Sequence, residues 1–423
     1  MRKRFFQKPI SCELSPNMRW PQIFLILNYL FNPKFFGHWK KGEKIKLLEN
    51  AFKDKFNSLA AFSFDSGRTA LGVILQALEL KNGDEVALQA FTCVVVPNSI
   101  KAAYGLPVYL DIDKSYNLDV QKLEETLQTH HNLKAVIVQH TFGLVAEIEK
   151  ISQLCKKHHL YLIEDCAHAL GATYDNKLVG TFGDVAMFSF GRDKVISAVS
   201  GGLVIVNNSQ LIAKIEKIYK NTKHHSVFWI WQHLNHPLFF SIGKWLYYFF
   251  SLGKIIIELS KKLKLWPLVL QKQEKQGQAP QVYLLPNVLA DLAWEQFKNL
   301  EKLNLHRKSL AKSYLFALSR LAGIKLPKIL QNSRPIFLRF SFTLENREKV
   351  VKHARQAGLF LGNWYHQVID PSGSVKAMVN YKDGSCPRAE KIAEKIVNLP
   401  THINISNREL KKVINFFQEE IKS

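Results

Sequence analysis

The stretch that decides the fold is LYLIEDCAHALGATYDNKLVGTFGDVAMFSFGRDKVISAVSGGLVIV, residues 160–206. It opens with a short apolar run that ends abruptly in two carboxylates, Glu164 and Asp165. It closes with a second strand-like run, residues 185–190, which is followed by a turn and Lys194. Ligands of open α/β sheets bind outside the carboxyl ends of the strands. The stretch therefore predicts that Asp165 and Lys194 face one ligand.

An amine and a carboxylate in this arrangement are typical of a site for pyridoxal phosphate (PLP). The lysine forms a Schiff base with the carbonyl of such a cofactor, and the aspartate holds its protonated ring nitrogen. A carboxylate at the end of a buried strand is costly unless a cation or several donors meet it. Simpler explanations stay open. Asp165 can cap a helix, Lys194 can be a solvated lysine, and His168 can be a structural histidine.

Apolar segments alternate with helical patterns over most of the first half of the chain. Such alternation predicts an α/β fold with a mostly parallel, seven-stranded central sheet and helices on both faces. The predicted strands are residues 59–64, 85–89, 107–110, 135–139, 160–163, 185–190 and 203–206. The predicted helices among them are residues 69–80, 97–104, 120–128 and 148–158.

We expect four parts along the chain. Residues 1–41 form a basic N-terminal extension that lies on the rest of the protein or on a membrane surface, after which a helix is predicted over 44–56. The second part is a large cofactor-binding α/β domain, residues 42–220. The third, residues 221–280, is an aromatic and basic helical insertion that ends in a polar linker at 271–280. The fourth, residues 281–423, consists of a long helix over 288–318 and a smaller C-terminal α+β domain. In the last part a strand is predicted at 336–343, with helices at 347–357 and 409–422.

The net charge of +23 is spread unevenly. When Lys and Arg are counted against Asp and Glu, residues 56–206 carry −4 and residues 207–280 carry +8. Diffuse basicity fits nucleic acid, an anionic membrane or phosphorylated substrates, and composition does not choose among them. The five cysteines are dispersed, without a CxxC or zinc-ligand spacing, which favours reduced thiols in the cytoplasm and predicts no metal site.

From Lys244 onward the insertion has polar residues at helical spacing, which predicts one amphipathic helix. They are Lys244, Ser251, Lys254, Glu258 and Lys261. The apolar face of this helix is explained by packing on the protein or on a second subunit, and such packing is the commoner case. Its other explanation is peripheral contact of residues 221–270 with an anionic membrane. The uncharged stretches are too short or too polar for a spanning helix.

A strand, the turn DSGRT (65–69) and a helix follow one another near the start of the large domain. Glycine allows close approach to a phosphate, and the N–H groups that open a helix bind anions. The same turn is also explained as an ordinary helix cap by Ser66 or Thr69. Its combination with Asp165 and Lys194 in one sheet is much more specific than any of the three features alone.

Further stretches carry a resemblance to a known family. They are SGRTAL (66–71), GDEVALQAFTC (83–93), PVYLDID (107–113), IEDCAHALGA (163–172), GTFGDVAMFSF (180–190) with Lys194, and CPRAEKIAEKIVNLPTH (386–402). With them the chain, from about Gly42 to its C-terminus, resembles the DegT/DnrJ/EryC1/StrS family of PLP-dependent sugar aminotransferases. The resemblance implies the aspartate aminotransferase fold (fold type I).

The resemblance also implies roles for individual residues. Lys194 is then the catalytic residue that binds PLP and moves protons, Asp165 holds the ring nitrogen, and His168 lies beside the ring hydroxyl. Ser189 and the turn Gly67-Arg68-Thr69 hold the phosphate. Cys93 stands where many members stack an aromatic ring on the cofactor, and Phe91 is close to it. The implied substrates are a nucleotide-linked keto-sugar and glutamate, and the implied assembly is a homodimer.

The sequence also departs from the family pattern. Val199-Ser200-Gly201-Gly202 replaces a frequent Gly-Glu-Gly-Gly, and Gly191 stands where histidine is frequent. The Asn-x-Arg that reaches the partner's site in relatives is matched at best by Asn287 at a shifted position. Members that dehydrate sugars have lost the lysine, so Lys194 favours aminotransfer. The alternatives are another PLP-dependent reaction, such as that of a dehydratase or lyase, and a non-enzymatic basic protein on the same fold.

Overall fold

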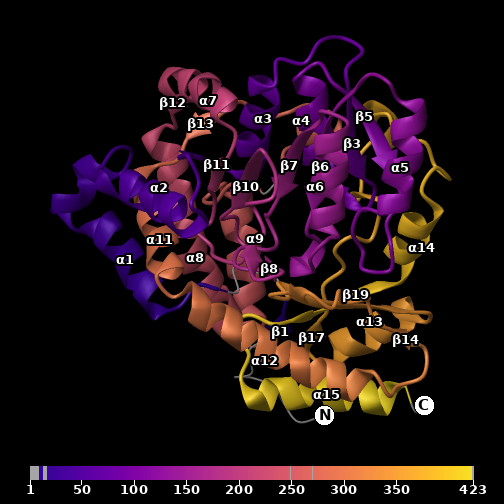
Figure 1. Ribbon diagram of the computed structural model, residues 1–423. Helices are drawn as coiled ribbons and strands as arrows, with labels where there is room; N and C mark the ends of the chain where they lie inside the picture. Colours follow the sequence, from indigo (N-terminus) through magenta and orange to yellow (C-terminus); the bar gives the residue numbers. More distant parts are fainter. Residues whose placement is uncertain (1–8, 13–16, 248, 269, 422–423) are drawn as a thin grey trace.

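The computed structural model describes residues 9–12, 17–247, 249–268 and 270–421. Figure 1 shows a large sheet with its helices in the upper part of the view and a smaller domain below it. The long helix α12 (Leu300–Leu318) and the helix α15 (Asn407–Glu420) lie side by side along the lower edge.

All seven predicted strands are present within two residues of the predicted bounds, and they are neighbours in one sheet. Two short strands, β12 and β13, extend this sheet at one edge. In order across the sheet the strands are β12 (Lys223–His224), β13 (Tyr283–Leu284), β2 (Ala60–Phe64), β11 (Gly202–Val206), β10 (Val185–Ser189), β7 (Tyr161–Asp165), β6 (Leu133–Gln139), β3 (Glu85–Gln89) and β5 (Leu106–Leu110). From β10 to β5 all pairs are parallel, whereas β11 runs antiparallel to both of its neighbours.

Helices cover both faces of the sheet, as predicted. Successive side chains of a strand point to opposite faces. In β6, Val136 and Val138 join one core cluster with α2, α5, α6 and α11, while Ala135 and Ile137 join another with α3, α4 and α7. The helices are α2 (Glu43–Phe56), α3 (Gly67–Ala77), α4 (Val95–Ala102), α5 (Val120–Thr129), α6 (Ile148–Lys157), α7 (Ser209–Asn221) and α11 (Asn287–Phe297). Burial on both faces explains why the strands read as continuous apolar runs.

The smaller domain has a three-stranded antiparallel sheet, β14 (Ile324–Lys325), β16 (Arg339–Leu344) and β19 (Ile396–Pro400). It also contains α13 (Arg347–Gln356) and α14 (Pro387–Lys395). The prediction of one long helix over 288–318 is wrong, because α11 ends at Phe297 and α12 begins at Leu300. The last predicted helix is α15, and its expected final residue, 422, lies outside the described residues. Two-residue strands complete the fold: β1 (Ile10–Ser11), β4 (Thr92–Cys93), β8 (Thr173–Tyr174), β9 (Lys177–Leu178), β15 (Ser333–Arg334), β17 (Leu359–Phe360) and β18 (Ile369–Asp370).

The described part of the N-terminal extension lies on the rest of the protein. Its helix α1 (Trp20–Phe31) buries Ile26 and Tyr29, and the Tyr29 hydroxyl donates to Asp291 Oδ2 of α11 at 3.0 Å. Figure 1 places α1 beside α11 and α2. The extension therefore packs chiefly on the helical layer over one face of the sheet.

The insertion forms two helices and a short third one: α8 (Val227–Trp245), α9 (Leu252–Lys262) and α10 (Lys272–Lys275). The prediction of one amphipathic helix from Lys244 onward is wrong, because the chain turns between Trp245 and Leu252. Lys244 and Lys254 therefore lie on different helices. The region predicted as a polar linker contains α10, whose Glu274 side chain is buried. Among the described helices none is long and apolar enough to cross a membrane.

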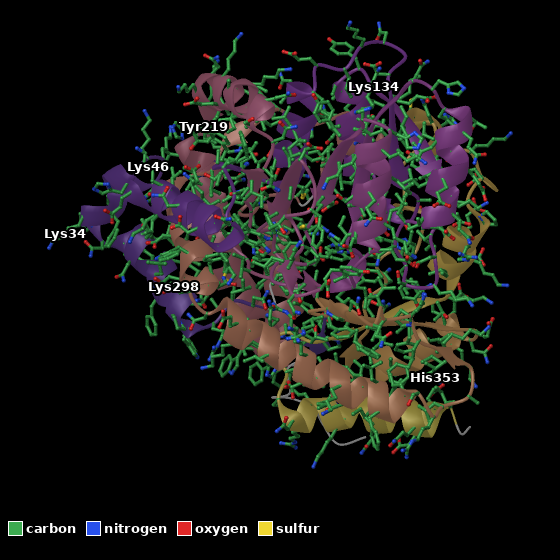
Figure 2. All side chains as sticks on the ribbon, in the orientation of Figure 1. Lys34, Lys46, Lys134, Tyr219, Lys298 and His353 are labelled. Atoms are coloured by element: carbon green, nitrogen blue, oxygen red, sulfur yellow. The ribbon has the colours of Figure 1, made fainter. Side chains whose placement is uncertain are left out.

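The basic surplus is spread over several sides of the molecule. Figure 2 shows the side chains of Lys34, Lys46 and Lys134 at the outline of the molecule, and each of the three is exposed. Lys134 lies apart from Lys34 and Lys46, so these three lysines do not form one basic patch.

Candidate functional site

The turn between β2 and α3 forms one end of the site. Ser66 caps α3, since its hydroxyl accepts the N–H of Thr69, and the Thr69 hydroxyl donates to Asp65 Oδ1 at 2.6 Å. The first N–H groups of a helix have no partner within the helix. The predicted helix cap and the predicted anion site are thus compatible. Thr69 contributes its side chain to the cap.

Gly67 is required at the first position of α3 because β10 comes very close. A Cβ at this position would lie 2.7 Å from Ser189 Cβ and 3.0 Å from Ser189 Oγ, nearer than side chains normally approach. On the neighbouring strand β11, a Cβ on Gly202 would lie 2.3 Å from the Ser66 carbonyl oxygen. The helix start and the Ser189 hydroxyl therefore form a tight cradle, which suits a phosphate group.

Arg68 lies at this cradle and is paired with a residue from the insertion. Its Nη1 is 2.7 Å from Glu274 Oε1, and only 3% of the Glu274 side chain is exposed. The Asn98 side-chain amide holds the backbone of the same short helix by donating to the Glu274 carbonyl oxygen. The insertion thus fixes the Arg68 guanidinium beside the cradle.

Asp65, two residues before the helix, is held by the insertion as well. Its Oδ2 is 2.7 Å from Nε2 of His225, whose ring is stacked between Trp229 and Tyr283 at centroid distances of 3.6 and 3.9 Å. A carboxylate and a histidine in this arrangement form a nearly buried pair. The turn that shapes the cradle is therefore braced from outside the large domain.

Asp165 lies at the carboxyl end of β7, as predicted. Its side chain is almost wholly buried, and Oδ1 accepts the N–H of Ala167 at 3.0 Å. Burial raises the pKa of this carboxyl group, while the Ala167 N–H and the Lys194 ammonium oppose the rise. A cationic ring nitrogen would meet the carboxylate and stabilise its charge.

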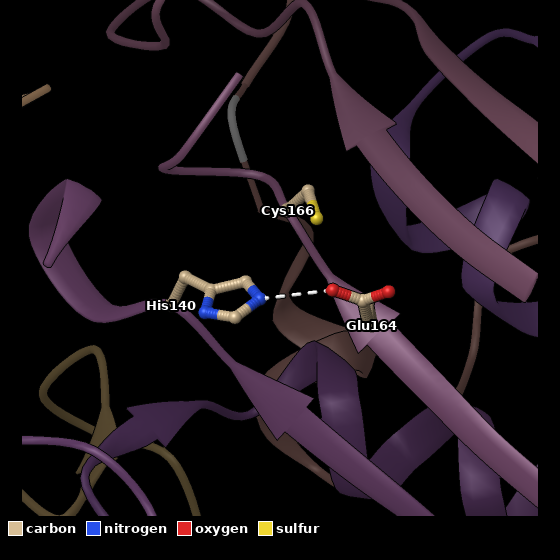
Figure 3. Close-up of side chains that lie close together, drawn as sticks. All are labelled: His140, Glu164 and Cys166. Atoms are coloured by element: carbon tan, nitrogen blue, oxygen red, sulfur yellow. Dashed lines mark hydrogen bonds and ion pairs between the residues drawn. The ribbon is translucent and has the colours of Figure 1, made fainter. Parts of the chain in front are cut away.

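The neighbouring carboxylate, Glu164, comes next to Asp165 on β7 and therefore points to the opposite face of the strand. It has a structural role, and Figure 3 shows it beside His140 and Cys166. It accepts three backbone N–H groups, from Gly180, Phe182 and Gly183, and His140 Nε2 lies 3.2 Å away. With Cys166 these two side chains place possible metal-ligand atoms within 4.8 Å of one another. Because Glu164 and His140 are both engaged in hydrogen bonds, we assign this cluster to positioning the end of β7, next to Asp165.

Lys194 follows β10 in a loop at the same edge of the sheet. Its Nζ lies 5.0 Å from the centre of the Trp364 ring, and Arg339 lies on that ring too, at 3.5 Å. Burial lowers the pKa of the Lys194 amine to about 8, against the opposing attraction of Asp165. The Asn17 amide of the N-terminal extension holds the Lys194 backbone by donating to its carbonyl oxygen at 2.5 Å. The structure therefore brings Lys194 and Asp165 into one site.

His168 is a neutral, buried ring at this site. Its Nδ1 accepts the N–H of Phe142 at 3.2 Å, and burial keeps the pKa of the imidazole well below its ordinary value. Its ring is nearly parallel to that of Trp364, at 12°, with the centroids 5.4 Å apart. The nearby charge of Lys194 lowers the same pKa further, so His168 and Lys194 belong to one electrostatic environment.

The two remaining candidates, Cys93 and Phe91, differ in their surroundings. Cys93 on β4 is close enough to feel the charges of Lys194 and Arg68, but burial raises the pKa of its thiol to about 11. Phe91 is wholly buried, edge-on to Phe142 and Tyr365, at centroid distances of 5.9 and 5.5 Å. Phe91 therefore supports the aromatic layer around His168, whereas Cys93 lies nearer to the charged groups.

Comparison with known proteins identifies the family. The model of the DegT/DnrJ/EryC1/StrS aminotransferase family matches residues 35–233 and 270–418. The chain belongs to this family. PLP is the cofactor of the family, and solved relatives include PLP forms. The expected resemblance and the expected fold type are confirmed.

Individual relatives of this aminotransferase family are similar over part or most of the chain. GDP-perosamine synthase of Escherichia coli O157:H7 is 35% identical over 172 residues, which is 40% of this chain and 47% of that protein. UDP-N-acetyl-3-dehydro-alpha-D-glucosamine 3-aminotransferase of Acidithiobacillus ferrooxidans is 26% identical over 82% of this chain and 80% of its own length. The structure of Helicobacter pylori PseC, an aminotransferase of pseudoaminic acid biosynthesis, superimposes with a TM-score of 0.74 at 19% identity, covering 99% of this chain and all of the other.

The family match omits residues 234–269, which include most of α8 and all of α9. These two helices are therefore an addition to the part of the chain that the family model covers. Several contacts around the site come from this region and its flanks, including those of His225 and Glu274. Sequence reasoning did not select these two residues, or Asn17. Glu274 lies in a segment whose sequence is typical of a polar linker, and nothing in its local sequence predicts that it is buried or that it contacts Arg68.

Proposed function

We propose that the chain is a PLP-dependent aminotransferase that converts a nucleotide-linked keto-sugar to an amino-sugar, with glutamate as the amino donor. The pathway would be that of a cell-surface polysaccharide or a secondary metabolite. The observation that carries the proposal is that Lys194 lies close enough to Asp165 for their charges to interact, beside the cradle formed by Gly67 and Ser189. The names of the relatives, a GDP-perosamine synthase and a UDP-sugar 3-aminotransferase, support the substrate class.

The residues present fit the cofactor at both of its ends. PLP supplies a reactive carbonyl carbon and an electron-withdrawing ring. The start of α3 and the Ser189 hydroxyl would hold the phosphate, and Asp165 would hold the ring nitrogen. The Lys194 amine, with a pKa of about 8, is partly neutral near neutral pH. It can therefore act as a nucleophile, and its Nζ can accept a proton and return it.

We propose that Arg339 binds an anionic group of the substrate. Its guanidinium is buried and lies on Trp364 at the site, 3.5 Å from the ring centre. Two other basic residues, Arg334 and Lys223, are exposed on the short strands β15 and β12. Arg339 is thus the best placed of the three, since it shares the Trp364 ring with Lys194.

The proposal extends to the surroundings of the enzyme. We propose a cytoplasmic homodimer that does not use nucleic acid as a partner, with peripheral contact to an anionic membrane through residues 221–270. Light scattering on the full chain tests the dimer. A measured mass of one chain, at a concentration where the enzyme is active, would contradict it.

The decisive experiment is the visible absorption spectrum of the purified full chain with PLP, before and after glutamate is added. We expect a visible band that glutamate bleaches, and we expect Lys194→Ala to lack that band. Lys298→Ala is the matched control, because Lys298 also lies over a tryptophan, at 5.7 Å from the Trp294 ring, but on the surface. This control should behave like the wild type.

The outcomes also separate the alternatives. If the wild type takes up no PLP, the enzymatic proposal fails. If PLP binds and glutamate leaves the band unchanged, a different donor or a dehydratase or lyase reaction replaces aminotransfer. Mass spectrometry of the sugar product then decides, because transfer of an amino group and loss of water change the mass differently.

A further inference from the structure

In the helical hairpin of α8 and α9, the second helix buries small residues, whereas α8 buries large ones such as Ile230, Leu234 and Phe240. A Cβ on Gly253 of α9 would lie 2.1 Å from the Gly243 carbonyl oxygen of α8, so the two backbones are in direct contact there. Gly253 and Ser260 are the buried residues of α9. A helix that packs only on a globular core normally buries its leucines and isoleucines instead.

Ile256 and Ile257 of α9 are half-buried. Three other large aliphatic residues of the helix, together with the residue at its C-cap, form one exposed stripe. They are Leu252, Ile255, Leu259 and Leu263, which are between 40% and 59% exposed. Their spacing of three, four and four residues places them on one side of a helix with 100° per residue. Trp245, at the end of α8, and Phe250, in the bend, are 59% and 72% exposed. The hairpin therefore presents a continuous run of apolar side chains to solvent.

The charges of the hairpin select the kind of surface that can cover this stripe. Lys254, Lys261, Lys262 and Lys264 are exposed, and Glu258 is the one acidic residue among residues 251–264. On the same helical wheel Lys254 and Lys261 lie away from the stripe, as on the polar face of an interfacial helix. An anionic, partly apolar surface satisfies both features. A second copy of the hairpin would bring positive charge to positive charge.

We propose that the face of α9 formed by Leu252, Ile255, Leu259 and Leu263 docks on an anionic lipid bilayer, with the neighbouring lysines on the headgroups. The helix has 11 residues and lies in the bilayer surface, since none of the described helices can cross it. All of α9, and with it the docking face, lies outside the residues matched by the family model.

Docking would hold the active site close to the membrane. Trp266 and Pro267, just after α9, contact Arg192 in the loop that carries Lys194. At the other end of the insertion, His225 contacts Asp65. The hairpin is thus tied to the cofactor cradle and does not hang on a loose linker.

The test is flotation of the full chain with vesicles of phosphatidylcholine alone and of phosphatidylcholine with 30% phosphatidylglycerol. We expect the wild type to float with the anionic vesicles and to be released by salt. Ile255→Glu and Leu259→Glu should each lower the vesicle-bound to free ratio at least about tenfold, because each removes a large apolar side chain from the interface. The double variant Lys261→Ala/Lys262→Ala should lower it about thirtyfold. Leu305→Glu is the matched control, since Leu305 is 66% exposed on α12, and it should bind like the wild type.

Any of three results would overturn the proposal. The first is that the wild type does not float with anionic vesicles, and the second is that all variants float equally. The third is that Ile255→Glu and Leu259→Glu split an oligomer in light scattering and leave flotation unchanged, which would assign the face to a second copy. The proposal would also be overturned if duplex DNA released the chain from the vesicles while Ile255→Glu and Leu259→Glu still bound them like the wild type. Because flotation does not require PLP, failure here is distinguishable from failure of the proposed aminotransfer.

Discussion

Replacing Gly67 by alanine tests whether the start of α3 is the phosphate cradle. The new Cβ would lie 2.7 Å from Ser189 Cβ, whereas ordinary contact begins at 3.4 Å. Either the first turn of α3 or the end of β10 must shift to remove the overlap. Such a shift moves the helix N–H groups relative to the Ser189 hydroxyl. Loss of one hydrogen bond to a charged phosphate costs about 1.5–3 kcal/mol. We therefore expect PLP to bind about ten- to a hundredfold more weakly.

The same helix provides the matched control. Gly72 has no atom within 4 Å of the position of an added Cβ. In a helix, alanine is favoured over glycine by about 1 kcal/mol. Gly72→Ala should therefore bind PLP like the wild type and resist denaturant slightly better. The double variant Gly67→Ala/Ser189→Gly removes the overlap together with the hydroxyl, which separates crowding from the loss of a phosphate ligand.

The assay is a titration of each full chain with PLP, followed by visible absorbance, with a denaturant unfolding curve of each variant as a check on folding. Recovery of affinity in the double variant would show that crowding is the cause of the loss. The reasoning is refuted if Gly67→Ala is folded and binds PLP as tightly as the wild type. The phosphate would then lie elsewhere, and Gly67 would serve only the packing of α3 on β10.

Three further predictions concern the buried charges around the site. Because the pKa of Lys194 is about 8 in the folded chain and about 10.4 when unfolded, its charge destabilises the fold below pH 8, and this penalty fades as pH rises to about 10.4. Lys194→Met should thus stabilise the cofactor-free chain by up to about 3 kcal/mol at pH 7, as measured by denaturant unfolding. This gain in stability should vanish near pH 10.5, and a gain that does not depend on pH would contradict the prediction. Glu274→Gln removes the negative charge that is paired with Arg68, which should cost about 1–3 kcal/mol of stability. Because Glu274 then no longer competes with the anion for Arg68, protection by inorganic phosphate in thermal melts should become stronger. Weaker protection would show that the fixed position of Arg68 matters more to the anion than this competition. Glu164→Gln places an amide donor among three N–H donors and should lower the free energy of unfolding by about 3 kcal/mol. A decrease of less than about 1 kcal/mol in this free energy would mean that His140 and water replace the carboxylate.

The central sheet was predictable because burial on both faces leaves a strong local signal. Strands covered on both sides are continuous apolar runs, and polar residues appear where they leave the core. Asp165 at the end of β7 and Lys194 after β10 were found in this way, and parallel neighbours bring such ends to one edge. Gly67 was marked by its place between a strand and a helix. The reason that only glycine fits, the approach of Ser189, needs the pairing of distant strands.

The helix boundaries show where periodicity alone fails. The apolar pattern from 288 to 318 continues through Lys298 and Asn299, yet α11 ends and α12 begins there. Between α8 and α9 the polar spacing also continues, while Gly243 and Gly253 allow the chain to fold back on itself. The spacing of apolar and polar residues does not show where a helix ends. After a turn, residues that continue the same spacing lie on a different helix and can face another direction.

The second layer of the site could not be read from the sequence because its members come from distant segments. Asn17 holds the carbonyl of Lys194 across 177 residues, and Glu274 reaches Arg68 across 206. These contacts hold groups that the family motifs supply. The low pKa of Lys194 arises chiefly from burial, and the Trp364 ring of the smaller domain lies 5.0 Å from its Nζ. Family membership therefore accounts for the amine and the acid. Variants of Asn17, of Glu274 and of the α9 face therefore test contacts that lie outside those motifs.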